Sequence, residues 1–583
     1  MNTVGLTKAV SILFFGVLIS GCGLTQMTSK YDTVIYTVTP PILQVHGGKV
    51  AVKIDGNIPA KYFHKDATVD FTPVLTSSAD IPEGLIVKVM KDNNYSREET
   101  IDFLSIQHPF KTITLQGEEA SGGQKTISYA TGGSFTYEDK INYTEDMIVS
   151  GLEIKAVAKL KDQLEPLGPV TIAQGVIATS ERVENTEEIA IAHHGYEKET
   201  ILSEFATIYF LVNQSVIRTS EKSDEDMNRL QEFAKLGYKT HSIEIKSFAS
   251  PDGTVDANDD VSERRNKSTV RYTKQILKRL KLDGVTHEEL YTNVSYGEDW
   301  DGFNKLMKAS DMKDKRRVLN IVNSVQNPEK REQAIRDMAE LYDAIDKNIL
   351  PQLRKAQIMI RSYQPKKTNE EIASLSISSP DSLDVKELLF SATLTNERST
   401  KMKIYNTAVS LHKDWRAYNN IASIYIGENN LEEASTWLDK AFEISENNAD
   451  VLTNYGIIAA RNGNLGKAQQ LFNQANASDK NQAILDIRQG KYAKAERYFK
   501  NANTHNATLA KVLNGDNSSS CTDNTAACYY LNAIVGARSD NMQMLTQNLS
   551  KAIAADASYK TDAANDLEFV NYRENQEYNA LIK

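Results

Sequence analysis

The sequence predicts a multidomain α+β protein with an N-terminal β-sandwich region, a central α/β domain with a helical insertion, and a C-terminal α-helical solenoid. Three observations support this fold class. Short runs of alternating apolar and polar residues fill the first third of the chain, strands and helices alternate in the middle, and a helical pattern repeats near the end. A chain of 583 residues is also too long for one hydrophobic core.

The composition is that of ordinary globular protein, with 40% apolar and 25% charged residues. The formal net charge is −10, and no basic stripe gathers lysine and arginine on one face. Because nucleic acid is bound mainly through its phosphates, this balance argues against a nucleic-acid partner.

Residues 1–21 have the pattern of a lipoprotein signal peptide. Lys8 precedes the apolar run AVSILFFGVLIS, which is short for a membrane span and leads into Ser20-Gly21-Cys22. Small residues before a cysteine resemble a bacterial lipobox, which implies that Cys22 is acylated, for instance with palmitate, and becomes the mature N-terminus. A secretory signal with a chance cysteine is the alternative. Acyl chains contribute about 0.8 kcal/mol per buried CH₂, so an acylated Cys22 would anchor the protein in a membrane.

Residues 22–180 are expected to form the β-sandwich region, as one or two small domains. Runs such as KVAVKIDGNI, ATVDFTPVL and GLEIKAVAKL have the alternation of half-buried strands, and Gly, Asp, Asn and Pro separate them. The segment SERVENTEEIAIAHHGYEKET that follows is expected to be a connector.

Residues 200–366 are expected to form the α/β domain. The expected strands are IYFLVNQSVI, HSIEIKSFAS, YTNVSYGEDW and RKAQIMIRSY, of which the first and the third lead into turns. An amphipathic helix, SDEDMNRLQEFAKLG, lies between the first two. A second helix follows the second strand, and a helical insertion at about residues 301–348 precedes the last. This order suits one sheet backed by helices.

The loop SFASPDGTVDANDDVSERRNKS joins the second strand to the second helix. Ser262 is the expected N-cap, which would place Arg265 in the first turn of the helix. Free amides and partial positive charge at a helix N-terminus suit a carboxylate, and Arg265 adds a planar donor fork. Gly253 permits the turn, and Asn258 can bridge backbone groups of the loop.

This loop and its surroundings resemble the OmpA-like peptidoglycan-binding family. The family has a glycine turn, an asparagine and then Leu-Ser-x-x-Arg, and VSYGED and LRKAQIMI resemble its later turn and closing strand. The resemblance extends over about residues 208–363. It implies a site for the diaminopimelate of the peptidoglycan stem peptide, in which an arginine binds a carboxylate and an aspartate binds an ammonium. The matching residues are Gly253, Asn258, Val261, Ser262 and Arg265.

One position departs from the family, because Ser250 stands where the aspartate is expected. Asp252 can either replace it or be the ordinary acid of a Pro-Asp-Gly turn. A charge-assisted hydrogen bond contributes on the order of 1.5–3 kcal/mol, so affinity falls tenfold or more unless Asp252 compensates. The alternative keeps the fold and loses the ligand. The expected peptidoglycan-binding residues are Arg265, Asp252, Ser250, Asn258 and Ser262.

Residues 380–583 are expected to be helical with an internal repeat. The pattern of AYNNIASIYIGENNLEEASTWLDKAFEI returns 34 residues later in VLTNYGIIAARNGNLGKAQQLFNQA, so that Ala434 matches Ala468 and Leu438 matches Phe472. This period and these small residues resemble the tetratricopeptide repeat (TPR). A generic helical bundle, the alternative, would have no fixed period. The resemblance implies a concave face for an unknown protein partner.

Cys521 and Cys528 are expected to form a disulfide, since an exported protein lies in an oxidising space; two free buried thiols are the alternative. The histidines are scattered and have no zinc-ligand spacing, so no metal site is expected. Phosphate-binding and nucleophile-elbow motifs are absent from the sequence, and we expect neither an enzyme nor a cofactor.

Together these features predict a lipid-anchored protein of the cell outer membrane, mostly periplasmic, that tethers the membrane to peptidoglycan and presents TPR-like repeats to protein partners. The outer membrane is expected because Gly23, not an acid, follows Cys22. The alternative is an assembly or scaffold factor of an outer-membrane machine for secretion or barrel insertion, whose OmpA-like domain no longer binds peptidoglycan. Two triplets, Asp32-Thr33-Val34 and Asp381-Ser382-Leu383, resemble an O-glycosylation signal of the Bacteroidetes.

Overall fold

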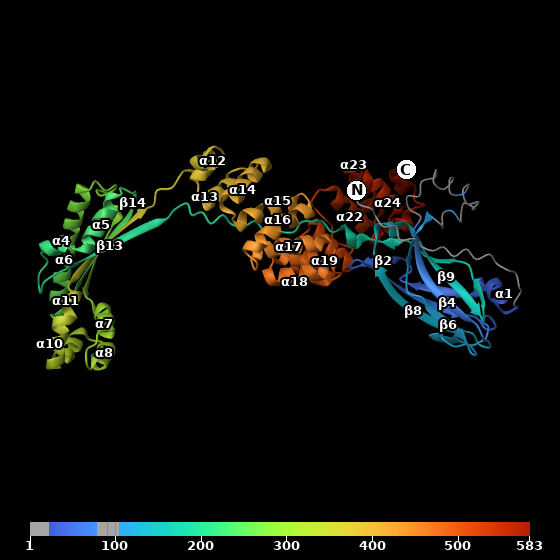
Figure 1. The fold of residues 1–583 in the computed structure, drawn as a ribbon, viewed down its shortest axis with the longest axis horizontal. Helices are drawn as coiled ribbons and strands as arrows, with labels where there is room; N and C mark the ends of the chain where they lie inside the picture. Colours follow the sequence, from blue (N-terminus) through green and yellow to red (C-terminus); the bar gives the residue numbers. More distant parts are fainter. Residues whose placement is uncertain (1–21, 78–89, 91–99, 101–103) are drawn as a thin grey trace. The chain divides into compact units, whose positions relative to one another are not determined.

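The computed structural model describes residues 22–77, 90, 100 and 104–583, and Figure 1 shows its elements. The expected signal peptide therefore lies outside the described residues. The chain divides into two compact units: unit 1 is Met1–His193 with Lys413–Lys583, and unit 2 is His194–His412. No helix in the described part of the chain combines the length and the apolar character that a bilayer crossing requires.

The first part of unit 1 is a β-sandwich that follows a short helix, α1 (Cys22–Ser29). One sheet has the order β1-β3-β2-β12 with β8 beside β3; the other has the order β10-β9-β4-β6-β7 with β11 beside β9 and β5 beside β4. One buried cluster includes Ile54 and Phe135 from the first sheet and Phe71 and Leu152 from the second. The two sheets thus share a single core, as in a sandwich. The strands are β1 (Ile35–Thr39), β2 (Leu43–His46), β3 (Lys49–Ile58), β4 (Thr68–Ser77), β5 (Ile106–Pro109), β6 (Ile113–Gly117), β7 (Lys125–Ile127), β8 (Gly133–Asn142), β9 (Ser150–Leu160), β10 (Gln163–Pro166), β11 (Val170–Gln174) and β12 (Val176–Ile177).

Unit 2 contains a sheet of order β13-β16-β14-β15, in which β14 and β15 are parallel and β16 is antiparallel to both β13 and β14. Buried residues alternate along β14 and β16, and their apolar side chains pack against α5 and α6 (Figure 1). The order of strands and helices is the one expected from the sequence. The elements are β13 (Ile201–Tyr209), α4 (Thr219–Lys222), α5 (Glu225–Lys235), β14 (Thr240–Ala249), α6 (Val255–Arg279), β15 (Tyr291–Glu298) and β16 (Lys355–Tyr363).

The first strand of this sheet begins earlier than predicted. The segment IYFLVNQSVI was expected to be a strand that leaves into a turn; β13 begins at Ile201 and ends at Tyr209, and the rest of the segment is a loop that contains the turn. Asn213 has a positive φ of 53°, a turn conformation that asparagine tolerates and a strand does not contain.

The helical insertion has its own buried cluster, which includes Phe303, Val318 and Ile345. It consists of α7 (Trp300–Ala309), α8 (Lys315–Ser324), α9 (Pro328–Arg336), α10 (Ala339–Asn348) and α11 (Leu350–Leu353). The helices α12 (Asn369–Ser378), α13 (Val385–Ser391) and α14 (Arg398–His412) also belong to unit 2, which ends at His412.

The helical part of unit 1 consists of packed helix pairs. The predicted matching positions Ala434, Leu438, Ala468 and Phe472 are all fully buried. A Cβ atom at Gly456 would come 2.4 Å from the Phe472 ring, which explains a glycine there. The helices are α15 (Trp415–Gly427), α16 (Leu431–Ile444), α17 (Ala449–Arg461), α18 (Leu465–Ala475), α19 (Asp479–Arg488), α20 (Tyr492–Phe499), α21 (His505–Leu513), α22 (Ala526–Arg538), α23 (Met542–Ala555), α24 (Ser558–Asn565) and α25 (Gln576–Ile582).

Candidate functional sites

The predicted ligand loop in unit 2 enters its helix earlier than expected. Helix α6 begins at Val255, and its N-cap is Thr254, whose hydroxyl accepts a 3.4 Å hydrogen bond from the amide of Ala257. The prediction that Ser262 caps this helix is therefore wrong: the Ser-Pro-Asp-Gly turn leads straight into the cap, and the acidic residues form the first turns. Arg265 lies well inside the helix, away from the free amides of its N-terminus.

The Arg265 side chain is enclosed by its own chain. It is only 1% exposed, and its three nitrogens donate to three main-chain carbonyls. Nε bonds the carbonyl of Gln214 at 3.0 Å, Nη1 that of Phe248 at 2.8 Å, and Nη2 that of Leu211 at 3.2 Å. Burial, together with the neighbouring Arg354 guanidinium, lowers the pKa of Arg265 to about 10. The donor fork that was expected to bind a ligand carboxylate thus holds the β13–α4 loop and the end of β14.

Asp252 and Ser250 are also bound within the chain, by Arg354 from the end of the insertion. Arg354 Nη2 lies 2.7 Å from Asp252 Oδ2, and its Nε donates to the Ser250 hydroxyl at 3.0 Å. The Ser250 hydroxyl in turn donates to Asp252 Oδ1 at 2.8 Å. Arg336 donates to the carbonyl of Asp252. A ligand ammonium would have to displace Arg354 from this carboxylate.

Asn258 and Ser262 complete the set of predicted residues. Asn258 Nδ2 donates to the carbonyl of Gly253 at 3.2 Å and to Glu298 Oε1 at 2.9 Å, so it joins the turn to β15. The Ser262 hydroxyl lies 2.5 Å from that of Ser295. The five predicted residues therefore lie around the end of β14, and each has a partner in its own chain.

A second set of buried polar side chains lies in unit 1. We call residues 183–193 the connector; it is extended and runs along the alternate helices α15, α17, α19 and α21. One buried asparagine on each of these helices bonds both the N–H and the C=O of one connector residue. The amide-to-Oδ1 distances are 2.6–2.9 Å and the Nδ2-to-carbonyl distances 2.8–3.2 Å. The pairs are Glu184 with Asn506, Glu188 with Asn481, Ala190 with Asn454 and Ala192 with Asn420.

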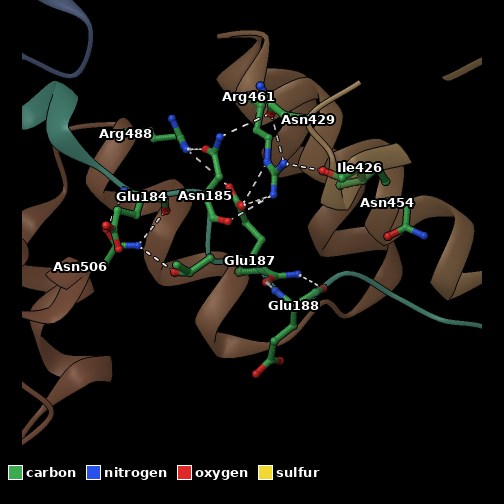
Figure 2. Close-up of polar contacts among 12 residues, drawn as sticks. Glu184, Asn185, Glu187, Glu188, Ile426, Asn429, Asn454, Arg461, Arg488 and Asn506 are labelled. Carbon is green, nitrogen blue, oxygen red and sulfur yellow. Dashed lines mark hydrogen bonds and ion pairs between the residues drawn. The ribbon is translucent and has the colours of Figure 1, made fainter. Parts of the chain in front are cut away.

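One connector carboxylate is buried between two guanidinium groups, as Figure 2 shows. The Glu187 side chain is 1% exposed; its Oε2 lies 2.8 Å from Arg461 Nη2 and its Oε1 3.5 Å from Arg488 Nη2. Burial lowers the pKa of Arg488, and the Glu187 carboxylate opposes that shift. The next residue, Glu188, turns its exposed side chain away from both arginines.

The same asparagine pattern occurs once more at the disulfide. Cys521 and Cys528 are joined in the structure, with their Cα atoms 5.5 Å apart. Asn532, on α22, accepts from the Cys521 amide at 2.8 Å and donates to its carbonyl at 3.0 Å. The helical part of unit 1 thus holds a loop of its own in the way that it holds the connector.

Sequence reasoning identified the connector but missed both the asparagines and the partner of Asp252. The sequence did contain a signal for the asparagines, because Asn420 and Asn454 lie one 34-residue period apart at the same place in the repeat. No comparable pattern pointed to Arg354, which is about a hundred residues from Asp252 and was expected only to begin a strand.

Comparison with protein-family models matches residues 416–448 to the tetratricopeptide repeat. The match covers α15 and α16, confirms the TPR-like prediction for that segment, and indicates a role in protein–protein interaction. A comparison with curated proteins finds no match.

A metal site was not expected from the sequence, because the histidines have no zinc-ligand spacing. Among the residues that the structure describes, no group of three or more His, Cys, Asp or Glu side chains is placed to hold a metal ion.

Proposed function

We propose that this chain is a lipid-anchored scaffold of the bacterial cell envelope, one that binds protein partners and keeps an OmpA-like domain without the peptidoglycan ligand. This is the second of the two functions expected from the sequence. The observation that carries it is the state of Arg265, whose three donor nitrogens are bound by carbonyls of its own chain.

The energetic reason is competition between a ligand and the existing contacts. A diaminopimelate stem would offer a carboxylate to Arg265 and an ammonium to Asp252. Both groups already have charge-assisted or main-chain partners in a buried setting. Since the ligand would replace these bonds and not add to them, the net gain in binding free energy is small.

The proposed anchor is an acylated Cys22, supported by the lipobox pattern and by Gly23 at the following position. Lipid at this end would hold the β-sandwich near the outer membrane. The TPR match supports the binding of protein partners, and an outer-membrane machine for secretion or barrel insertion is the proposed setting.

Sedimentation with purified diaminopimelate-type peptidoglycan tests the main point. We expect the purified full chain to stay in the supernatant, as does the variant Asp252→Asn. Pelleting of the wild type that Asp252→Asn or Arg265→Ala abolishes, and that Arg264→Ala leaves intact, would restore the tether function. Arg264 is the matched control because its side chain is 48% exposed and pairs with the exposed Asp260 in the preceding turn.

Labelling with radioactive palmitate tests the anchor. The wild-type chain should carry label and fractionate with membranes, whereas Cys22→Ala should do neither. An unlabelled wild-type chain would contradict the lipid anchor and leave the peptidoglycan test unaffected.

A further inference from the structure

The surface that binds the connector recognises the main chain. We call the four asparagines that bond the connector, Asn420, Asn454, Asn481 and Asn506, the asparagine ladder. We call the face of α15, α17, α19 and α21 that carries them, together with Arg461 and Arg488, the ladder groove. Each of the four asparagines bonds the backbone N–H and C=O of its connector residue, groups that each non-proline residue carries; Asn506 also donates to the Thr186 hydroxyl. The ladder therefore selects an extended conformation and is indifferent to the side chains at these positions.

Sequence selectivity comes from the site of Glu187. Two guanidinium groups meet its carboxylate, and Arg461 is held in place by a 2.9 Å bond from its Nη1 to the carbonyl of Ile426. A neutral residue here would leave buried cations without a carboxylate, which is costly. Two residues later, Ile189 packs against the apolar cluster of α15–α18. The groove thus favours an acid followed two positions later by an apolar side chain.

The connector itself has the properties of a bound peptide. Residues 183–193 form neither helix nor strand, and their order comes from contacts with the helices. Both ends are joined covalently to folded parts of the chain, so the local concentration of the connector at the groove is on the order of millimolar. A segment of another protein must compete with it.

We infer that the ladder groove is a receptor for an extended segment of a partner protein that carries a glutamate and, two residues on, an apolar residue, and that the connector is a built-in competitor for this site. This inference rests on the proposed scaffold function, because it names how a protein partner is recognised. The partner segment exchanges with the connector.

The test uses a fluorescein-labelled peptide of residues 182–193 and fluorescence anisotropy. The receptor is the full chain in which residues 183–192 are replaced by a Gly/Ser sequence of equal length, with its helical content checked by circular dichroism. We expect the peptide to bind this chain at least about tenfold more tightly than it binds the intact chain, whose groove is occupied.

The peptide itself carries the matched control. Glu187→Gln in the peptide should weaken binding at least about tenfold, whereas Glu188→Gln, one residue away and exposed, should change it less than about twofold. Equal affinities of the two modified peptides, or no binding to a folded receptor, would overturn the inference.

A second receptor covers the case in which the Gly/Ser chain does not fold. The intact chain with Glu187→Gln has a weakened connector, so it should admit the unmodified peptide, and the chain with Glu188→Gln should not. If neither the Gly/Ser chain nor the Glu187→Gln chain binds the peptide, the inference that the ladder groove is a peptide receptor is overturned. Neither result depends on lipid or cell wall, so the scaffold function and this inference fail separately.

Discussion

Both units bury polar side chains against their own main chain, but they use different chemistry to do so. In unit 2 the guanidinium of Arg265 bonds carbonyls only, because an arginine side chain has no acceptor. In unit 1 each asparagine both donates and accepts, as a neighbouring strand would. Arg265 therefore closes a loop within one domain, whereas the asparagines hold a segment more than two hundred residues away in the sequence.

The comparison shows why burial alone does not identify a ligand site. A buried cation needs acceptors, and in unit 2 the chain supplies them. A ladder of amides needs an extended main chain, which any protein can supply. The Arg265 site in unit 2 resembles a known ligand-binding family but is closed by contacts within its own domain. The ladder groove in unit 1, which no family motif marked, is the better candidate for exchanging its bound segment with a partner.

The largest effect is expected from removing Arg265, which tests whether this side chain holds the loop of unit 2. Arg265→Ala removes three hydrogen bonds and a side chain that is 1% exposed, so the free energy of unfolding of unit 2 should fall by about 3–5 kcal/mol. Urea denaturation followed by fluorescence measures it. Arg264 is exposed and pairs with Asp260 in the preceding turn, so the control Arg264→Ala should cost less than about 0.5 kcal/mol. Similar values for the two variants would show that Arg265 does not hold the loop.

The next largest effect is expected from removing one of the four asparagines that bond the connector. Asn454 is fully buried and bonds the N–H and C=O of Ala190 and the side chain of Asn419, so Asn454→Ala should lower the free energy of unfolding of unit 1 by about 2–3 kcal/mol. Asn473→Ala, exposed on α18, is the control and should cost under about 0.5 kcal/mol. An equal, small loss in both would mean that the connector is only loosely held.

Reduction of the disulfide has a smaller expected effect on unit 1. Cys521 and Cys528 are seven positions apart and close a short loop, so reduction should destabilise the unit by about 2 kcal/mol. Thermal melts with and without dithiothreitol measure this. The double variant Cys521→Ser, Cys528→Ser should melt at the same temperature in both buffers, and a reductant effect there would assign the loss to another cause.

The smallest expected effect is a dependence of unit 2 on pH. Burial raises the pKa of Glu332, on α9, to about 7, and Arg336 opposes part of that shift. Because this pKa is higher in the folded chain than in the unfolded one, the folded chain holds the proton more tightly between pH 5 and 7. Stability should therefore fall as the pH rises through this range, by about 1–2 kcal/mol relative to Glu332→Gln.

Denaturation of the two proteins at pH 5 and pH 8 gives the difference. Glu329→Gln, an exposed acid on the same helix, should follow the wild type. Parallel curves for wild type and Glu332→Gln would contradict the raised pKa.

The sequence predicted those parts of the fold that depend on local periodicity. Alternation predicted the sandwich strands, and the 34-residue period predicted the buried places of Ala434 and Phe472. Helix capping was misplaced because Thr254 and Ser262 are both acceptable N-caps, and the turn before Thr254 decides between them.

The sites depended on contacts that periodicity does not encode. Arg354 and Ser250 are 104 positions apart in the sequence, and Glu188 of the connector is 293 positions from Asn481, so no local pattern joins them. Nothing in the adjacent pair Glu187 and Glu188 tells which one is buried, because that is fixed by the register of the connector on the ladder.

Hydrogen exchange at the connector tests the central claim most directly. In the wild-type chain, the amides of Glu184, Glu188, Ala190 and Ala192 are bound by asparagine side chains. We predict that they exchange at least about a hundredfold more slowly than the same amides in the free peptide of residues 182–193. Exchange at the rate of the free peptide would contradict the account.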